Sequence, residues 1–226
     1  LGLFMDGYFV LGEDINYNKA WTPYKNFSFY WANAESNAWT NGAKCGFQGV
    51  FDGRGHVIDG MSISGQYNAF VVTMNSNAEL KNLIFTNASV SDNSSFLARA
   101  EGGIYTNIYV QYKTISNSTS EYLATFAHTG NNANQKYNKV VIDVTSCTFD
   151  EEVKNVAFVA QWQAYGVYVV GKVFSEIPAF SQGDLASAQF ADFDSLLVDS
   201  VANVPTWDTS FWDTATGKPL AVTAAE

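Results

Sequence analysis

Two short sequence patterns alternate through the middle of this chain of 226 residues. The first is a brief apolar run whose copies align on Phe70, Phe96, Leu123 and Phe158. The second follows each copy of the first and aligns on Asn82, Asn107, Lys139 and Gly166, with an earlier copy at Gly60. Two patterns that keep the same order through several copies indicate a chain built from stacked structural repeats.

The spacing of the copies predicts a parallel β-solenoid, in which each repeat forms one coil. The second pattern steps by 22, 25, 32 and 27 residues, and its longer steps predict loops that bulge from the stack. Each copy is short, β-branched and alternating, as expected for a strand with one face in a narrow core. A β-sandwich is the alternative, since its strands also recur between turns, but a sandwich does not require two patterns in a fixed order.

The aligned position of the second pattern predicts the corners between strands. This position holds Gly, Asn, Asn, Lys and Gly in chain order. Gly and Asn adopt a left-handed backbone at low cost, and a sharp corner requires that conformation. Stacked corners would also bring Asn82 next to Asn107, where the two side-chain amides can form a ladder.

The two ends of the chain lack the repeat and are predicted to be caps. Residues 49–174 are expected to form the coils, residues 1–48 an N-terminal cap with an aromatic loop, and residues 175–226 an acidic C-terminal cap. A solenoid needs caps because its terminal coil is an open sheet edge. Within them, Tyr8–Leu11 is predicted to be a first strand, and the apolar spacing over 184–201 predicts one or two short helices.

The composition favours an all-β protein and excludes several classes of function. The chain has 22 acidic and 12 basic residues, a net charge of -10, and 47% hydrophobic residues. It is too apolar to be disordered and too acidic to hold nucleic acid by its phosphates. No apolar run reaches the roughly 18 residues of a membrane span, so we expect no membrane insertion. Because an initiator Met is lacking, we expect a processed product or a piece of a longer protein.

Several segments resemble the GLUG-motif surface proteins, which are right-handed parallel β-helices of the pectin-lyase-like group. The segment from Phe47 to Gly60 is similar to the family's "FxGxFDGxGHxIxG" run. Further likenesses are Tyr8–Ile15, Asn68–Phe70, Leu80–Leu83, Trp207, Trp212 and Gly217–Leu220. Two departures are a longer gap between Lys25 and Cys45 and the loss of most "GLFG" glycines.

The resemblance implies a right-handed parallel β-helix. Together with the repeats, it leads us to expect about five short coils, with an N-terminal cap and a partly helical C-terminal cap. It also implies an extracellular location, on a bacterial cell surface or on a virion. Many such proteins are modules of long adhesin-like polypeptides. Neighbouring modules or subunits of a larger assembly are therefore expected partners.

Pectin-lyase-like folds also include polysaccharide lyases and hydrolases, so an enzyme is the alternative function. A lyase needs a base beside a group that neutralises a uronate, and a hydrolase needs two facing carboxylates. The two arginines, Arg54 and Arg99, lie in a turn and in a repeat strand, and His56 belongs to the turn motif. The acids Asp59, Glu79, Asp143 and Glu151 do not recur at one position of the coil. We therefore expect no catalytic residues.

No group of residues has the spacing of a metal site, and we expect no metal or cofactor. His128 has no Cys or His partner at ligand spacing. The two cysteines, Cys45 and Cys147, are compatible with one disulfide or with two buried thiols.

Two loops combine aromatic and polar residues, as a glycan site requires. The predicted ligand-binding residues are Tyr30, Trp31, Asn37, Trp39 and Tyr122. The first four lie in one loop, and the alternative is that their aromatic rings plug the open end of a solenoid, since a cap needs large apolar side chains. Tyr122 lies in a long polar loop between coils, which can contact a ligand, a neighbouring subunit or another module.

These observations predict a non-enzymatic, extracellular or virion-surface β-helix module. Its expected role is attachment, adhesion, assembly, or recognition of a glycan or a surface protein. A virion structural protein and a bacterial adhesin both fit this description.

Overall fold

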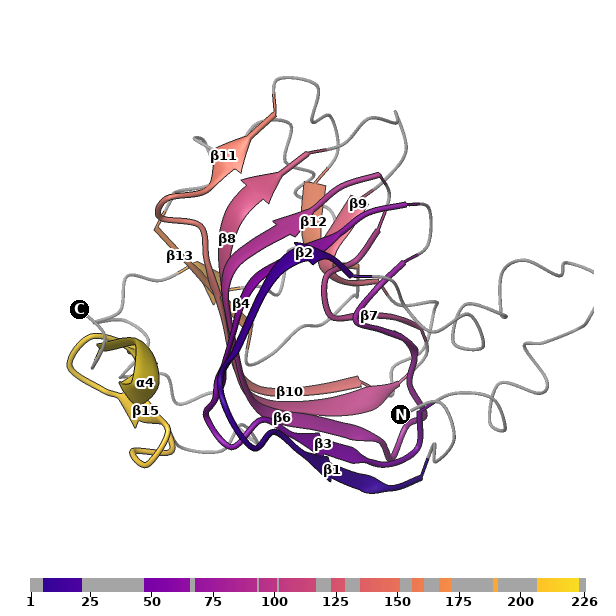
Figure 1. The fold of residues 1–226 in the computed structure, drawn as a ribbon, viewed down its shortest axis with the longest axis vertical. Helices are drawn as coiled ribbons and strands as arrows, with labels where there is room; N and C mark the ends of the chain where they lie inside the picture. Colours follow the sequence, from indigo (N-terminus) through magenta and orange to yellow (C-terminus); the bar gives the residue numbers. More distant parts are fainter. Residues whose placement is uncertain are drawn as a thin grey trace, which may run out of the picture.

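The computed structural model describes residues 6–21, 47–65, 68–92, 94–100, 102–116, 123–128, 135–150, 156–160, 167–171, 189–190 and 207–223. Regular structure in these ranges is almost entirely β strand, and the described helix is the single turn α4 (Leu220–Thr223). The predicted mainly β fold is therefore confirmed (Figure 1). None of the described helical residues forms a segment with the length and apolarity that a bilayer span requires.

The larger sheet stacks strands that are distant in sequence, and every pair within it is parallel. Its main path runs through β1 (Tyr8–Val10), β3 (Val50–Asp52), β6 (Glu79–Val90), β8 (Gly103–Ile115), β10 (Gln135–Asp143), β13 (Val167–Val170) and β14 (Gln189–Phe190). Beside this path lie β2 (Ile15–Ala20), β4 (Val57–Ile63) and β11 (Thr148–Phe149). Strands that pair directly belong to successive levels of the stack, and each level is called a layer below.

A second parallel sheet contains the four copies of the first sequence pattern. Its order is β5 (Val71–Thr73), β7 (Ala98–Ala100), β9 (Leu123–His128) and β12 (Val156–Ala160). The prediction that these copies stack is confirmed. Their register differs from the sequence alignment by one or two residues, since Val71 pairs with Ala98 and Leu123 pairs with Val156.

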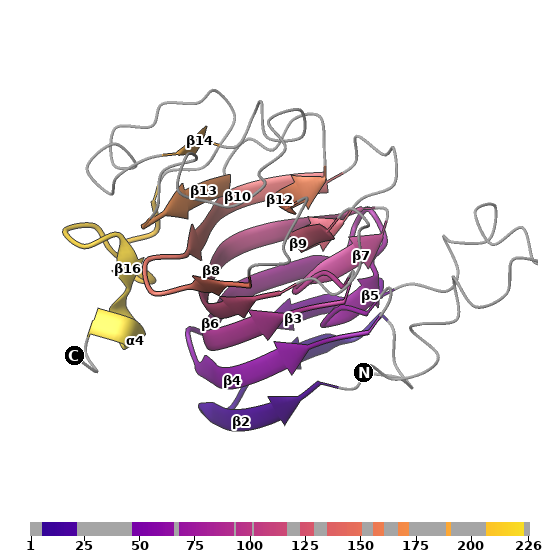
Figure 2. The same ribbon diagram turned by 90° about the horizontal axis from the view of Figure 1, so that it is seen from above.

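The long strands of the larger sheet bend, so that each lies along two sides of the molecule (Figure 1). The first half of β6 pairs with β3, and its second half pairs with β4. In the layer before β6, a turn at residues 53–56 therefore separates β3 from β4. At the same level, β6 continues as one strand. The second sheet closes the third side of the core (Figures 1 and 2).

The bend in each long strand occurs at a residue with a left-handed backbone. The φ angles are 51° at Asn82, 52° at Asn107 and 59° at Lys139. These three corners were predicted and are confirmed, whereas Gly166 lies outside the described residues. Lys139 shows that the stack imposes the conformation even on a side chain that disfavours it.

The predicted alignment of Gly60 with Asn82 is wrong. Asp59 pairs with Thr86, which places Gly60 opposite Asn87, in a second column of left-handed residues. The φ angles are 71° at Gly60, 51° at Asn87 and 39° at Asn18. The two columns were confused because β6 carries two such corners in succession, five residues apart, and each lies two residues after a buried apolar residue, Leu80 or Phe85.

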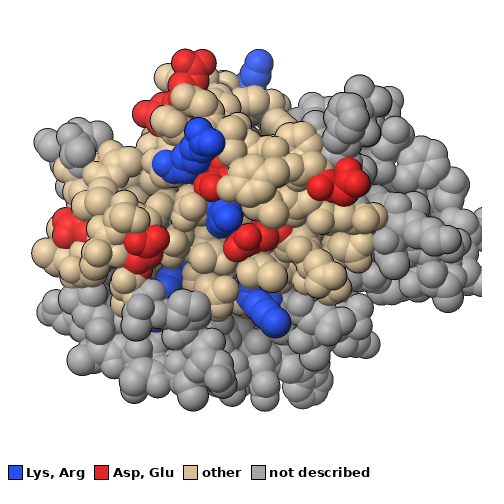
Figure 3. Space-filling view, turned by 90° about the horizontal axis from the view of Figure 1, so that it is seen from below, with Lys and Arg blue, Asp and Glu red and all other residues tan. Residues whose placement is uncertain are grey.

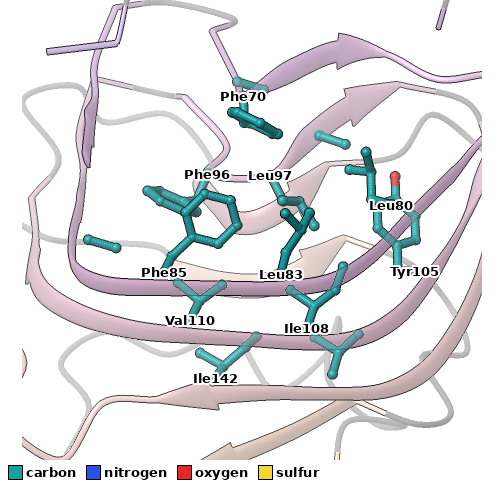
Figure 4. Packing of buried hydrophobic residues seen from close by; sticks show 14 of the residues in the cluster. Phe70, Leu80, Leu83, Phe85, Phe96, Leu97, Tyr105, Ile108, Val110 and Ile142 are labelled. Atoms are coloured by element: carbon teal, nitrogen blue, oxygen red, sulfur yellow. The ribbon is translucent and has the colours of Figure 1, made fainter. Parts of the chain in front are cut away.

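The core is made of columns of inward-facing side chains that repeat from layer to layer (Figure 4). Leu83, Ile108 and Val140 occupy one column, and all three are fully buried. Aromatic rings line the adjoining side, where Phe70, Phe85, Phe96 and Tyr112 meet edge to face at centroid distances of 5.1–5.6 Å. Burial of these side chains supplies the main favourable free energy of the stack.

The described parts of the N- and C-terminal segments extend the larger sheet at both ends or pack on its outer face. The predicted first strand is present as β1, and β1 and β2 add one more layer to the sheet. In the predicted helical segment 184–201, the two described residues instead form β14, because they extend the sheet beside β13. Residues 207–223 form the hairpin of β15 (Trp212–Asp213) and β16 (Lys218–Pro219) with α4, and pack against the flank of the sheet (Figure 2).

Gly53 tests the close approach of successive layers. A Cβ at this position would lie 2.4 Å from the carbonyl oxygen of Asn82, so Gly53→Ala forces the layers apart. We expect a loss of about 1–3 kcal/mol in the free energy of unfolding, measured by urea denaturation. Gly12→Ala is the matched control, because no atom lies within 4 Å of the Cβ it would add. Equal effects of the two substitutions would contradict the close approach.

Candidate functional site

The five residues predicted to bind a ligand, Tyr30, Trp31, Asn37, Trp39 and Tyr122, lie outside the described residues. So do Cys45 and Glu151, while Cys147 is buried in the core. Among the described residues, the candidate site comprises the polar residues at the corner formed by Asn82, Asn107 and Lys139, together with the C-terminal hairpin that packs beside them.

A column of polar side chains links the layers at this corner. The Asn107 amide donates to Oδ1 of Asn82 at 3.2 Å, and the Asn82 amide donates to Oδ1 of Asp52 at 3.0 Å. The predicted ladder between Asn82 and Asn107 is thereby confirmed. Asp52 ends it with two further bonds, from the backbone N–H of Arg54 at 2.9 Å and from the Tyr8 hydroxyl at 2.9 Å.

At the next layer the column continues with a buried lysine. Lys139 is 2% exposed, and its Nζ donates to the hydroxyl of Tyr168 at 3.1 Å. The same ammonium lies 4.9 Å from the ring centroid of Trp207 and 5.3 Å from that of Tyr168. A hydroxyl and two aromatic faces compensate for part of the desolvation of the charge.

The C-terminal hairpin covers an apolar stripe on the outer face of the sheet. The stripe consists of side chains that alternate with core residues and align across four strands, namely Ile84, Tyr109, Val141 and Tyr168. Trp212 and Phe211 pack on this stripe, and both are nearly buried. The Trp212 indole N–H donates to Oδ1 of Asn107 at 3.0 Å, so the hairpin also joins the polar column.

Two carboxylates at this junction are held ionised. Burial raises the pKa of Asp52, but hydrogen bonds from Arg54, Asn82 and Tyr8 and the charge of Lys81 lower it below its ordinary value. The pKa of Asp208 is lowered chiefly by hydrogen bonds from the side chain and backbone of Ser210, against a smaller effect of burial. Both groups therefore act as hydrogen-bond acceptors at neutral pH.

A hollow of about 290 Å³ lies between the corner and the hairpin. Its polar lining includes Asp52, Arg54, Asn82, Asp208 and Ser210, and its apolar lining includes Ile84, Phe211 and Leu220. We call it the corner hollow. Sequence reasoning missed it, because Arg54 and Asp208 are far apart in the chain and no pattern links the closing segment to that turn.

Other acids of the described residues bridge neighbouring strands. Asp59 accepts hydrogen bonds from Thr86 and Asn87, each at 2.7 Å. Glu79 accepts one from Thr106 at 3.1 Å, and its second oxygen lies 3.6 Å from Lys81. These side chains thus hold layers together.

Two further polar pairs have the same bridging role. Asp143 is buried and accepts a hydrogen bond of 2.6 Å from the hydroxyl of Tyr109, on the preceding layer. Nδ1 of His56 lies 3.0 Å from Asp14, whose carboxylate also accepts the backbone N–H of Val57 at 2.9 Å. Within the described ranges, His56 therefore fixes a turn to the first layer.

Comparison of the chain with protein-family models finds no match, and neither the curated proteins nor the solved structures yield one.

Asn107 tests the energetic importance of the polar column. Asn107→Gly keeps the left-handed corner but leaves Trp212 Nε1 and Asn82 Oδ1 without these partners, so we expect a loss of about 1–3 kcal/mol in unfolding free energy. Asn18→Gly is the control, since Asn18 also has a left-handed backbone, with a φ of 39°, but is exposed and donates to Asn16 of its own strand. Thermal and urea unfolding should show little change for Asn18→Gly, and a similar loss at both positions would contradict this role.

The ionised carboxylates predict an acid-sensitive fold. Because the pKa values of Asp14, Asp52 and Asp208 in the folded state lie below the ordinary 3.8, their stabilisation is complete above about pH 4 and is lost as pH falls through the folded values. Urea midpoints measured from pH 6 to pH 2.5 should fall below about pH 4. Asp52→Asn should flatten that fall, whereas the control Asp6→Asn at an exposed position should not. A midpoint independent of pH would refute the prediction.

Proposed function

We propose that the stacked sheets form a right-handed parallel β-helix of about five coils. We further propose that this β-helix is a non-enzymatic module of a GLUG-type surface protein. The parallel pairing of every layer and the recurring left-handed corners support the architecture. The module would act outside the cell or on a virion, as a scaffold for attachment and assembly.

The observation that carries this proposal is the use made of the polar side chains. The carboxylates of Asp52, Asp59, Glu79 and Asp143 all accept hydrogen bonds from residues of a neighbouring layer. Side chains committed in this way stabilise the stack and are poorly placed to exchange protons with a substrate. A rigid scaffold is what an attachment module needs, since recognition can then be carried by its loops.

The aromatic loop provides the proposed contact with a glycan or a surface protein. Tyr30, Trp31 and Trp39 offer flat apolar rings, and Asn37 offers an amide, which together suit a sugar ring and its hydroxyls. Tyr122, in the long loop between repeats, is the second proposed contact. Neighbouring modules or subunits of a larger assembly remain proposed partners for the same loops.

A polysaccharide hydrolase or lyase is the alternative, and one observation bears on it. Asp52 and Asp208 both line the corner hollow, beside Arg54. A glycosidase needs one carboxylic acid with a raised pKa to protonate the leaving group. Both pKa values are lowered, so neither carboxyl group is suited to that step. The non-enzymatic function is therefore favoured.

The aromatic loop can be tested by the double substitution Trp31→Ala and Trp39→Ala. If the loop binds the ligand, binding to a glycan array or to target cells is lost while the Tm and the circular dichroism spectrum are retained. If these rings plug the end of the stack, the double variant unfolds at a lower temperature instead. Lys113→Ala, on the described part of β8, serves as the control for a surface substitution.

The non-enzymatic character can be tested with a panel of neutral and acidic polysaccharides. After prolonged incubation, we expect neither new reducing ends nor unsaturated products. Product formation that disappears in Asp208→Asn would overturn the proposal in favour of a hydrolase or lyase.

A further inference from the structure

Arg54 is not accounted for by the scaffold. It lies in the turn between β3 and β4 with a φ of 52°, a conformation that favours glycine. Its backbone N–H bonds to Asp52, but no hydrogen bond or ion pair joins its guanidinium to another described residue. The residue is exposed and lines the corner hollow. A strained position with an uncommitted charged group indicates a role in binding.

From this geometry we infer that the corner hollow binds one neutral hexose unit of a glycan. The inference rests on the proposed function, because it names a ligand class and a second binding site for that module. Sugar hydroxyls would donate to the carboxylate of Asp208 and accept from the guanidinium of Arg54, while Asp52, whose oxygens are bonded to Arg54, Asn82 and Tyr8, forms the floor of the hollow. The apolar wall formed by Phe211 and Leu220 suits the CH face of a sugar ring.

The size of the hollow suits a single sugar ring. Its volume of about 290 Å³ is just below the range for small-molecule sites, which is about 300–1,000 Å³. A longer chain would extend over the neighbouring surface. The ring of Tyr8 lies there, 61% exposed, with its hydroxyl bonded to Asp52 at 2.9 Å and Lys81 Nζ 5.5 Å from its centroid. An aromatic ring held by two contacts can stack a second sugar unit.

The charges favour a neutral sugar over an acidic one. Two ionised carboxylates and one guanidinium line the hollow, so a uronate would meet net repulsion. Among the described residues of the face drawn in Figure 3, basic and acidic side chains are intermixed. Hydroxyl groups, which both donate and accept hydrogen bonds, match such a surface.

The test uses two variants that alter the hollow without disturbing the core. Arg54→Gly removes the guanidinium and suits the local φ, so its Tm should not fall. Leu220→Arg fills the hollow from α4, where Leu220 is 44% exposed. Lys19→Ala, at an exposed position on β2, is the control. The probes are methyl glycosides of glucose, galactose, mannose and N-acetylglucosamine, with methyl glucuronide as the acidic comparison, measured by saturation-transfer NMR and calorimetry.

We expect the full chain to bind at least one neutral glycoside more tightly than the glucuronide. Its affinity should fall at least about tenfold in Arg54→Gly and in Leu220→Arg, and remain unchanged in Lys19→Ala. The inference is overturned if no neutral glycoside binds, if both variants bind normally, or if the glucuronide binds best.

The same experiment separates the hollow from the proposed function. If glycan binding is lost in the Trp31→Ala and Trp39→Ala variant but retained in Arg54→Gly, the module binds glycans and the hollow does not. If the probes or their polymers are cleaved, the proposed function itself fails.

Discussion

The structure depends on one constraint: at the corner of Asn82, successive layers turn at the same place and so stay paired on both sides of it. In a parallel ladder a corner without a counterpart shifts the register, as happens between β6 and β8 after Phe85, where Asn87 has no left-handed partner in β8. The left-handed residues Asn82, Asn107 and Lys139 therefore form a column in spite of their different side chains. Gly53, at the same level of the preceding layer, has no space for a Cβ against the Asn82 carbonyl.

The polar column and the outer apolar stripe lie side by side at this corner, and the same hairpin contacts both. The Asn82 amide bonds to the layers on both sides, and the Asn107 amide bonds to Asn82 and to Trp212 of the hairpin. Partly buried amides thereby remain hydrogen-bonded. Directly beside them, the outer apolar stripe is shielded by Trp212 and Phe211. Trp212 contacts both, since its ring covers the apolar stripe and its N–H bonds to Asn107 of the polar column. The corner hollow is the space that this arrangement leaves open between the turn at Arg54 and the hairpin.

Local sequence patterns predicted much of the stacked sheets, but not the packing of the C-terminal hairpin on them or the corner hollow beside it. The repeats predicted the parallel sheets, the three corners and the contact between Asn82 and Asn107, because each depends on residues that recur at a fixed interval. The assignment of Gly60 failed, since two corners of β6 have the same residue types and only the pairing register separates them. The hollow was not predicted, because it requires Asp208 to meet Asp52, and no periodicity connects a single closing segment to one turn. The sites predicted in the aromatic loop and at Tyr122 stay predictions.

The position of the C-terminal hairpin has a mechanical consequence. Hydrogen bonds between layers run along the stack, so a pulling force in that direction would separate the layers one after another. The hairpin crosses this direction: Trp207 packs on Tyr168 in a late layer, and Phe211 lies against the turn at Gly55 in an early one. It therefore acts as a tie across several layers, and a load applied to the stack is shared between the ladder and the side chains that anchor the tie. For a module that holds two bodies together under flow, such a tie would raise the force needed to begin peeling.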